Sequence, residues 1–593
     1  MTTPVDAFDG YRRSGVTRFV QSAIVIDNEA ELSARKSTAK PKKPATRAPV
    51  SRLVAKAPAA AAAAAASPAE LASKAEDAET EISQELDAKS LTDAWSDREV
   101  ICGLYRPEPG EGEQMVVRAQ KAALHADVVI LDWFLEKSSS VRAKEIVRAI
   151  LKADRASNGR LRLLAIYTSQ TGVSGIAKEI FDTVEEEPLL SGLLTLDGAV
   201  LSGPNIRICV LSKPQTIGTS DVDKVDESNL PGRLIEEFAK LSKGLLTSFA
   251  LHSIAAVRRA AHHLVTVFQQ DLDGAFLGHR CASEQPDDSR EFAVELLIGE
   301  LRNVIAVDEA IDGRLDDEIL DAWVDQRAAT GFSSQGKTVS SDAVKALLKG
   351  GKDAVESGQF FIAADGKAQG GALKAQNMGR LFYQDDDAAW SGHLALSRVA
   401  NFKREAFGRT QLPSGFLPTL ALGSVLKSLG PMDESETALY AGLTDEFYVC
   451  MQPRCDSVRL QDTDVGFPFQ TARTSSLLFN LVIKERGQDA GTPVLVGSKL
   501  SNVVVISFPR EDATKSVRAV KQDDGFVFTD TRGRKFLWLG DLRDMKAQQD
   551  ASALAATLHR VGLDQLEWLR MASNKNTMSD FKPQPAAEAA IDP

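Results

Sequence analysis

Residues 128–132 have the sequence VVILD, a continuous apolar run that ends on a single carboxylate. Uninterrupted apolar runs of this length are typical of parallel strands that are buried on both faces. Similar short runs occur at 22–26, 100–105, 161–167 and 206–211. The chain from 22 to 211 therefore contains five predicted strands, with 128–132 in the middle.

Helical patterns separate these strands. The apolar residues between 143 and 151 recur at i, i+3, i+4, i+7 and i+8, which is one face of a helix. Residues 86–95 and 114–125 also favour helix. The alternation predicts an α/β fold, a doubly wound parallel sheet of five strands with helices on both faces. Ligands of such sheets bind at the carboxyl ends of the strands.

Polar residues follow four of the five predicted strands. They are Asp27, Asn28 and Glu29 after the first strand, Asp132 after the third, Thr168 after the fourth, and Lys213 with Pro214 after the fifth. Each residue alone has an ordinary explanation as a turn or helix-cap residue. All four groups together, at strand ends that meet at one edge of a sheet, predict a shared site.

This arrangement resembles the receiver domain of response regulators, from Ala23 to Pro214 apart from an insertion. The whole chain also resembles large bacterial proteins described as having a response receiver domain. That second resemblance includes the strings CMQPRCDSVRL at 450–460, WLGDL at 538–542, and RVGL with EWLR between 560 and 570. It implies a flavodoxin-like fold and a two-component phosphorelay, in which the domain takes a phosphoryl group and controls an output module.

The resemblance gives each residue a role. Asp132 would be the nucleophile that forms an acyl phosphate. Asp27, Asn28, Glu29 and Asp132 would supply or position the oxygen ligands of Mg²⁺, the implied cofactor. Thr168 and Lys213 would bind the phosphoryl oxygens through a hydroxyl and an ammonium group. The implied partner is a histidine kinase or a kinase-like ATPase.

The sequence departs from the receiver pattern in three places. Asn28 stands where receivers commonly have a second acid, and Val210 stands where an aromatic residue often precedes the lysine by three. Tyr167 is a candidate replacement for that aromatic residue. The step from Thr168 to Lys213 is longer than usual, and a hairpin-like stretch at 193–201 lies inside it.

Composition divides the chain further. Basic residues among Ala, Pro and Ser, followed by polyalanine, predict a disordered low-complexity insertion at about 31–84 within a receiver domain at 18–215. We expect a mostly helical domain at 231–435, an α+β domain at 436–573 and a disordered tail at 574–593.

The overall composition bounds the function. The 593 residues carry a formal net charge of -12, which argues against a nucleic-acid partner. Five cysteines in a chain of this length favour a reducing cytoplasm over a disulfide framework. No apolar run is long enough for a transmembrane helix, and the N-terminus lacks a signal-peptide pattern. We therefore expect a cytoplasmic protein with no membrane partner.

Other candidate sites have simpler explanations. Cys450 and Cys455 have a C-x4-C spacing that zinc could use, with His279 and Cys281 as further ligands, but Cys450 ends an apolar strand where a buried thiol is common. The pair His262 and His263 lies on a predicted helix, where a structural role is favoured over phosphorelay chemistry.

Three hypotheses remain open. The favoured one is a signalling protein whose receiver is phosphorylated on Asp132 by a separate kinase. The second is an unphosphorylated pseudo-receiver that acts as a docking scaffold, because Asn28 weakens metal binding. The third is a receiver-gated enzyme of unknown class. Whether the chain forms a homodimer stays open as well.

Overall fold

The structure is a computed structural model in which most of the chain is described. The described residues are 4–31, 86–108, 110–136, 139–216, 220, 222–282, 288–308, 315–328, 331–334, 337–351, 353, 361–362, 368–369, 378–408, 410–431, 437–438, 446–458, 460–476, 478–488, 490–497, 502–523 and 525–561. Residues 32–84 of the predicted insertion and the predicted tail at 574–593 lie outside these ranges. The chain divides into two compact units, one of residues 1–331 and 339–361 and one of residues 332–338 and 362–593.

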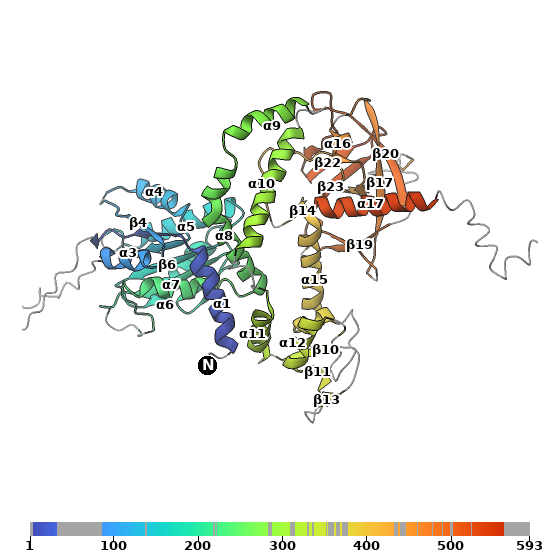
Figure 1. Cartoon of the computed structure of the whole chain (residues 1–593). Coiled ribbons are helices and arrows are strands. Elements are labelled where there is room, and N and C mark those ends of the chain that lie inside the picture. The colour runs from blue at the N-terminus through green and yellow to red at the C-terminus, as the bar shows by residue number, and fades with distance from the viewer. Residues whose placement is uncertain are drawn as a thin grey trace, which may run out of the picture. The chain divides into compact units, whose positions relative to one another are not determined.

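The first unit contains a seven-stranded sheet (Figure 1). Its five parallel strands are β1 (Ser22–Ile26), β4 (Ile101–Tyr105), β5 (Val128–Leu131), β6 (Arg162–Thr168) and β9 (Ile206–Ser212). Their order is β4-β1-β5-β6-β9, which is the 2-1-3-4-5 order of flavodoxin-like sheets. The five-stranded parallel sheet predicted from the sequence is confirmed.

Two antiparallel strands extend this sheet beyond the prediction. The hairpin-like stretch at 193–201 forms β7 (Thr195–Asp197) and β8 (Val200–Ser202), and β8 pairs with β9. The hairpin therefore covers the edge that β9 would otherwise expose. The short strands β2 (Ala30–Glu31) and β3 (Leu86–Asp87) pair in parallel, so the chain leaves and re-enters around 32–85 at neighbouring positions.

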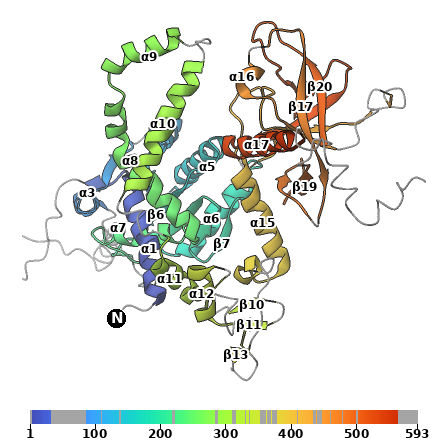
Figure 2. The ribbon, with the colours of Figure 1, turned by 45° about the vertical axis from the view of Figure 1, so that its right-hand side comes forward.

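Helices cover both faces of the sheet (Figure 2). The helices of the first unit are α1 (Pro4–Phe19), α3 (Ala88–Ser96), α4 (Glu113–Ala123), α5 (Val141–Ala156), α6 (Val173–Glu185), α7 (Leu230–Ala239), α8 (Leu245–Val267), α9 (Asp271–Ala282), α10 (Asp288–Val307), α11 (Asp317–Arg327) and α12 (Ser341–Gly350). Alternate strand residues face opposite cores. Val129 and Leu131 of β5 face α4, α5 and α6, whereas Val128 and Ile130 face α3, α7 and α8.

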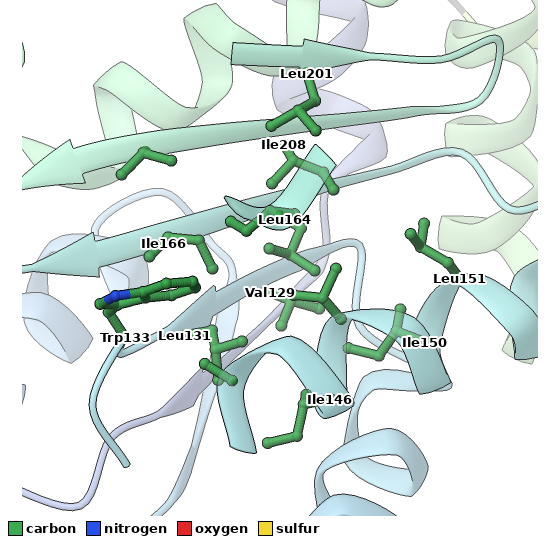
Figure 3. Close-up of a cluster of buried hydrophobic side chains, with 14 of the residues drawn as sticks. Val129, Leu131, Trp133, Ile146, Ile150, Leu151, Leu164, Ile166, Leu201 and Ile208 are labelled. Atoms are coloured by element: carbon green, nitrogen blue, oxygen red, sulfur yellow. The ribbon is translucent and has the colours of Figure 1, made fainter. Parts of the chain in front are cut away.

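Figure 3 shows the first of these cores. Apolar side chains of the sheet meet those of α5 there, namely Val129, Leu131, Leu164, Ile166 and Ile208 against Ile146, Ile150 and Leu151. Trp133, directly after Asp132, turns back into the same core and is only 3% exposed. This packing holds the loop that follows β5 close to the sheet.

Helix α1, for which the sequence predicted no element, joins the sheet to the helices that follow it. Arg12 of α1 donates hydrogen bonds to the carbonyls of Ala239 and Ser242 at 2.6 and 2.9 Å, at the end of α7. Arg258 of α8 donates to the carbonyl of Phe19 at 2.7 Å, at the end of α1. The last carbonyls of a helix have no partner within it, so each guanidinium caps a neighbouring helix.

The second unit is built on a ten-stranded sheet with the main order β18-β19-β17-β16-β15-β23-β22-β21, to which β14 and β20 add. Its strands are β14 (Phe402–Glu405), β15 (Ser424–Ser428), β16 (Phe447–Cys450), β17 (Asp464–Thr474), β18 (Leu481–Ile483), β19 (Thr492–Val496), β20 (Val503–Pro509), β21 (Val520–Gln522), β22 (Gly525–Thr529) and β23 (Lys535–Leu542). The remaining elements are β10 (Phe332–Ser334), β11 (Lys337–Val339), β12 (Phe361–Ile362), β13 (Ala368–Gln369), the 3-10 helix η2 (Gly379–Phe382), α15 (Asp386–Asn401), α16 (Arg454–Ser457) and α17 (Asp544–Val561).

The α+β character predicted for this region is confirmed, and the structure adds elements. The region expected to be mostly helical also contains β14 and β15, and the longest strand, β17, was not predicted. Pro468 interrupts the strand pattern of β17 because it has no N–H to donate, yet its carbonyl still accepts from Met451 at 2.8 Å. The domain boundaries given for 18–215, 231–435 and 436–573 stay a prediction.

Among the residues that the structure describes, no helix has the length and apolar content needed to cross a bilayer.

Candidate functional site

The predicted site residues lie at the carboxyl edge of the parallel sheet. Asp27 follows β1 and Asp132 follows β5, and these two strands are neighbours at the point where the strand order reverses. Backbone hydrogen bonds continue past the strand ends, since the N–H of Asp132 donates to the carbonyl of Ile26 at 2.9 Å. The topology therefore brings the two carboxylates to one crevice of the kind that binds ligands in open α/β sheets.

Lys213 lies between these carboxylates. Its Nζ is 3.2 Å from Oδ2 of Asp27 and 3.5 Å from Oδ1 of Asp132. The three side chains are almost fully buried, with Asp132 the most exposed at 9%. An ammonium ion thus compensates two carboxylates that would repel each other in a low-dielectric site.

The other oxygen of each carboxylate accepts a hydrogen bond from a backbone N–H nearby in the sequence. Oδ1 of Asp27 accepts a hydrogen bond from the N–H of Glu29 at 2.7 Å, and Oδ2 of Asp132 accepts one from the N–H of Phe134 at 2.9 Å. Both are turns in which an aspartate binds the backbone two residues later. Each turn orients its carboxylate so that the other oxygen faces Lys213.

Thr168 completes the set at the end of β6. It is register partner of Ser212 on β9, and its carbonyl accepts from the N–H of Lys213 at 2.8 Å. The Thr168 hydroxyl accepts from the N–H of Gln170 at 3.1 Å, so its own proton remains available for donation. The last residues of β6 and β9 are therefore joined beside the carboxylate pair.

Comparison with known families gives the same result as the geometry. Residues 19–217 match the protein family described as "Response receiver domain". This segment is a response receiver domain. No curated protein and no solved structure matches the chain. A receiver domain indicates two-component-type signalling and interaction with partners of the histidine-kinase type.

The surroundings of Asp132 shift the pKa of its carboxyl group. Burial raises the pKa of Asp132 to about 6, while the charge of Lys213 acts in the opposite direction and Asp27 adds to the rise. Burial opposes the charge of Lys213, but Asp27 and Asp132 outweigh it and raise the pKa of the ammonium. At neutral pH the carboxylate of Asp132 is mostly ionised and can act as a nucleophile.

The donor set suits Mg²⁺ with two carboxylates. Receiver domains typically bind Mg²⁺ at the phosphorylation site, and Mg²⁺ often takes one or two carboxylates and keeps several waters. Within the described ranges, no three or more side chains of His, Cys, Asp or Glu form a metal-binding group. Asp27 and Asp132 both contact Lys213. The roles of Asn28 and Glu29 as further ligands stay a prediction.

Asn28 and Glu29 are half-buried in the loop after β1. The carbonyl of Asn28 accepts a hydrogen bond from Nε of Arg106 at 3.0 Å, which ties this loop to the end of β4. Arg106 was not predicted as a site residue, although it directly follows a predicted strand. Ser212, the register partner of Thr168, was not predicted either, and among the described residues its buried hydroxyl has no hydrogen-bond partner.

Tyr167 connects the site to the segment that leads into α7. Its hydroxyl donates to the carbonyl of Val225 at 2.7 Å, and Nζ of Lys213 lies 5.9 Å from the centre of its ring. The ring is fully buried. Tyr167 thus contacts both a site residue and the chain that follows it, as a replacement for the missing aromatic residue would.

The two cysteines considered as zinc ligands differ in their exposure. Cys450 is buried on β16, whereas Cys455 is exposed on α16 with its Sγ 3.4 Å from Oδ1 of Asp456. Neither cysteine belongs to a metal-binding group in the part of the chain that the structure describes.

Proposed function

We propose that this protein is a two-component-type phosphoprotein whose receiver domain accepts a phosphoryl group on Asp132 from a partner histidine kinase or kinase-like ATPase. The observation that supports this most directly is the Lys213 ammonium between Asp27 and Asp132. It lies at the carboxyl edge of a parallel sheet, in the segment that matches receiver domains. A cytoplasmic location follows as part of the same proposal.

The transfer is a displacement at phosphorus. A carboxylate oxygen of Asp132 attacks the phosphorus of a phosphohistidine on the kinase, the new O–P bond forms and the P–N bond breaks. The imidazole nitrogen leaves with the electron pair and can then take a proton from solvent. The product is an aspartyl phosphate.

Both reactants are anionic, so positive charge at the site lowers the barrier. Asp27 and Asp132 would hold Mg²⁺, with Asn28 and Glu29 as further predicted oxygen donors. When bound, Mg²⁺ supplies Lewis-acid neutralisation of the phosphoryl oxygens. Lys213 contributes a positive charge from the protein itself. Its Nζ lies 3.2 Å from Asp27 and 3.5 Å from Asp132, and its flexible side chain can move toward a phosphoryl group.

Transfer would also move the strand ends. Thr168 donates its hydroxyl proton to a phosphoryl oxygen, and Lys213 moves from the carboxylates to the same group. Because Tyr167 precedes Thr168 and binds Val225, a shift of Thr168 disturbs the contact between β6 and the chain that leads to α7. Helix α7 in turn is capped by Arg12 of α1, so the helices beyond the sheet receive the change. The second unit would be the output.

The test uses the full chain with Mg²⁺ and acetyl phosphate as the phosphodonor. Phosphate incorporation is measured on a phosphate-affinity gel, with Asp132→Asn as the variant and Asp182→Asn, at an exposed position on α6, as the control. We expect a Mg²⁺-dependent shift in the parent and the control, and none in Asp132→Asn. Absence of a shift with both acetyl phosphate and the candidate kinase, in a folded protein, would overturn the proposal.

A second candidate is a pseudo-receiver that docks partners without phosphorylation. Asn28 stands in place of a second acid at the end of β1, and this substitution favours the pseudo-receiver. Calorimetric titration with Mg²⁺ separates the two functions. Measurable binding that is lost in Asp27→Asn supports phosphorylation, whereas no binding together with unchanged partner docking by Asp132→Asn supports the scaffold.

A further inference from the structure

A buried hydroxyl beside the site has no hydrogen-bond partner among the described residues. It belongs to Ser212, the last residue of β9, which is fully buried. A hydroxyl that is buried without a partner costs free energy, and such groups in native proteins normally bind a neighbour, a water molecule or a ligand. The Ser212 hydroxyl is therefore available for a contact that forms in another state of the site.

The backbone of Ser212 is held on both sides. Its N–H donates to the carbonyl of Asp223 at 2.8 Å, and its carbonyl accepts from the N–H of Val225 at 3.1 Å. On the side of β6, the N–H of the next residue, Lys213, donates to the carbonyl of Thr168 at 2.8 Å. The hydroxyl therefore stays at the end of β9, and rotation within the side chain is its main freedom.

Ser212 and Thr168 lie on the same face of the sheet. They are register partners on the parallel strands β9 and β6. The residues two positions earlier, Val210 and Ile166, both belong to the core that α5 and α6 cover. Because side chains alternate between the two faces of a strand, Ser212 and Thr168 follow Val210 and Ile166 onto that face. Hydroxyl side chains that are paired on neighbouring strands can form a hydrogen bond with each other.

Thr168 can accept such a hydrogen bond and still bind a phosphoryl group. A hydroxyl donates one proton and accepts up to two hydrogen bonds. Oγ1 of Thr168 accepts from the N–H of Gln170 at 3.1 Å, so a second lone pair can accept from Ser212 while the proton goes to a phosphoryl oxygen. Consecutive hydrogen bonds polarise one another, so the contact with Ser212 would make Thr168 a stronger donor.

We propose that Ser212 is a positioning residue for phosphoryl transfer, and that its hydroxyl donates to Oγ1 of Thr168 when Thr168 turns toward the phosphoryl group. This inference rests on the proposed phosphorylation of Asp132. Before transfer, the buried hydroxyl destabilises the receiver domain, because it has no partner among the described residues. After transfer it gains one, so the new hydrogen bond favours the phosphorylated arrangement.

The test is the initial rate of phosphate incorporation into the full chain with Mg²⁺ and acetyl phosphate. Ser212→Ala removes the hydroxyl and should lower this rate by about fivefold, which is the effect of one hydrogen bond. Ser212→Thr keeps a hydroxyl and should restore most of the rate. The control is Ser248→Ala on α8, because Ser248 is equally buried but its Oγ lies 2.9 Å from that of Ser242. This control should be phosphorylated at the rate of the parent.

Two further measurements separate positioning from a structural role. In the unphosphorylated chain, Ser212→Ala should not speed the hydrogen exchange of β9, whereas Ser248→Ala should speed that of α8 because it breaks an existing hydrogen bond. In a Thr168→Ala background, Ser212→Ala should have no further effect on the phosphorylation rate, because Ser212 acts through Thr168.

Three results would overturn this inference and leave the proposed phosphorylation standing. They are an unchanged rate in Ser212→Ala, an equal slowing with and without Thr168, and faster exchange of β9 in unphosphorylated Ser212→Ala. A folded parent that takes no phosphate from acetyl phosphate or from the candidate kinase would overturn the proposed function itself, and the role of Ser212 with it.

Discussion

Strand β5 has a buried aspartate at each end, and the two carboxylates are held in different ways. Asp127 accepts from the N–H groups of Gln21 and Ser22 at 3.0 and 3.3 Å and forms a two-pronged pair with Arg258 at 2.9 and 3.2 Å. Asp132 accepts one backbone N–H and faces Lys213 at 3.5 Å. Arg160 adds a further charge to Asp127 at 3.6 Å.

The comparison shows how a structural acid differs from the proposed phosphoacceptor at the other end of β5. The oxygens of Asp127 are saturated by planar, fixed donors, so the group anchors α8 to the sheet and has no capacity for a ligand. Asp132 keeps one oxygen opposite a flexible ammonium group that can leave it. Asp127 and Asp132 have the same charge and similar burial. They differ in the number and type of the hydrogen-bond donors that bind them.

The largest expected effect concerns Asp127. Replacement by Ala leaves Arg258 and two backbone N–H groups without their acceptor, and should lower the opening free energy of β5 by about 4 kcal/mol. Hydrogen exchange of the peptide that covers residues 128–131 measures it. Asp132→Ala is the matched control and should lower it by less, because it removes fewer hydrogen bonds. Equal losses would contradict the comparison.

A smaller effect is expected at Lys213. Lys213→Met leaves Asp27 and Asp132 facing each other without compensation, which should cost about 2 kcal/mol of receiver stability at neutral pH. Adding Asp132→Asn should recover much of that loss, because one of the two charges is then absent. A double-mutant cycle measured by hydrogen exchange of β5 checks this, and strictly additive losses would mean that Lys213 does not compensate the pair.

Glu237 is a third buried acid, and like Asp127 its carboxylate is bound by several cationic side chains. It is 1% exposed and bound by Arg207, Arg233 and Lys240. Burial opposes its charge, but hydrogen bonds from Lys240 and Arg207 outweigh burial and lower its pKa from 4.5. The carboxylate therefore adds stability above that pH, and the contribution disappears as pH falls below it.

Glu237→Gln should cost about 1–2 kcal/mol at neutral pH. The difference between the variant and the parent should shrink as the pH falls below 4.5 and Glu237 becomes protonated. Hydrogen exchange of β9 over a pH series measures it, since Arg207 lies on that strand. A difference that is the same at all pH values would argue against a charged Glu237 as the anchor of α7.

The smallest expected effect is at Tyr167. Tyr167→Phe removes one hydrogen bond, to the carbonyl of Val225, and should cost about 1 kcal/mol while the buried ring keeps its packing. If Tyr167 transmits the state of the site, phosphorylation of the parent should change the hydrogen exchange of residues 222–229. In Tyr167→Phe this change should be smaller or absent. An unchanged difference would leave Tyr167 with a packing role alone.

The predicted receiver site depended on local sequence signals. Apolar runs such as 128–131 mark buried strands, and the polar residue that ends each run must lie at the sheet edge because the strands are parallel. Asp27, Asp132, Thr168 and Lys213 were predicted as site residues in this way. The pairing of Ser212 with Thr168 and the contact of Arg106 with Asn28 were not, because such contacts become visible only when the strands pair.

The second unit shows where such reasoning ends. Strand β14 pairs with β23 more than a hundred residues later, and β17 contains a proline that local propensity counts against a strand. In an antiparallel sheet assembled from distant segments, the pairing of the strands depends on the core that they bury together and not on a local sequence pattern. The cores around Val449 and Phe469 form on opposite faces of this sheet.

The sequence by itself determined the order of strands and helices in the receiver domain and the polar groups at its strand ends, because period, propensity and the identity of the last residue are local properties. Only the tertiary structure decided which cation meets which acid. Lys213 meets Asp27 and Asp132, whereas Arg258 meets Asp127. The partners are distant in the chain, so their meeting depends on how helices pack against the sheet, which no local pattern contains.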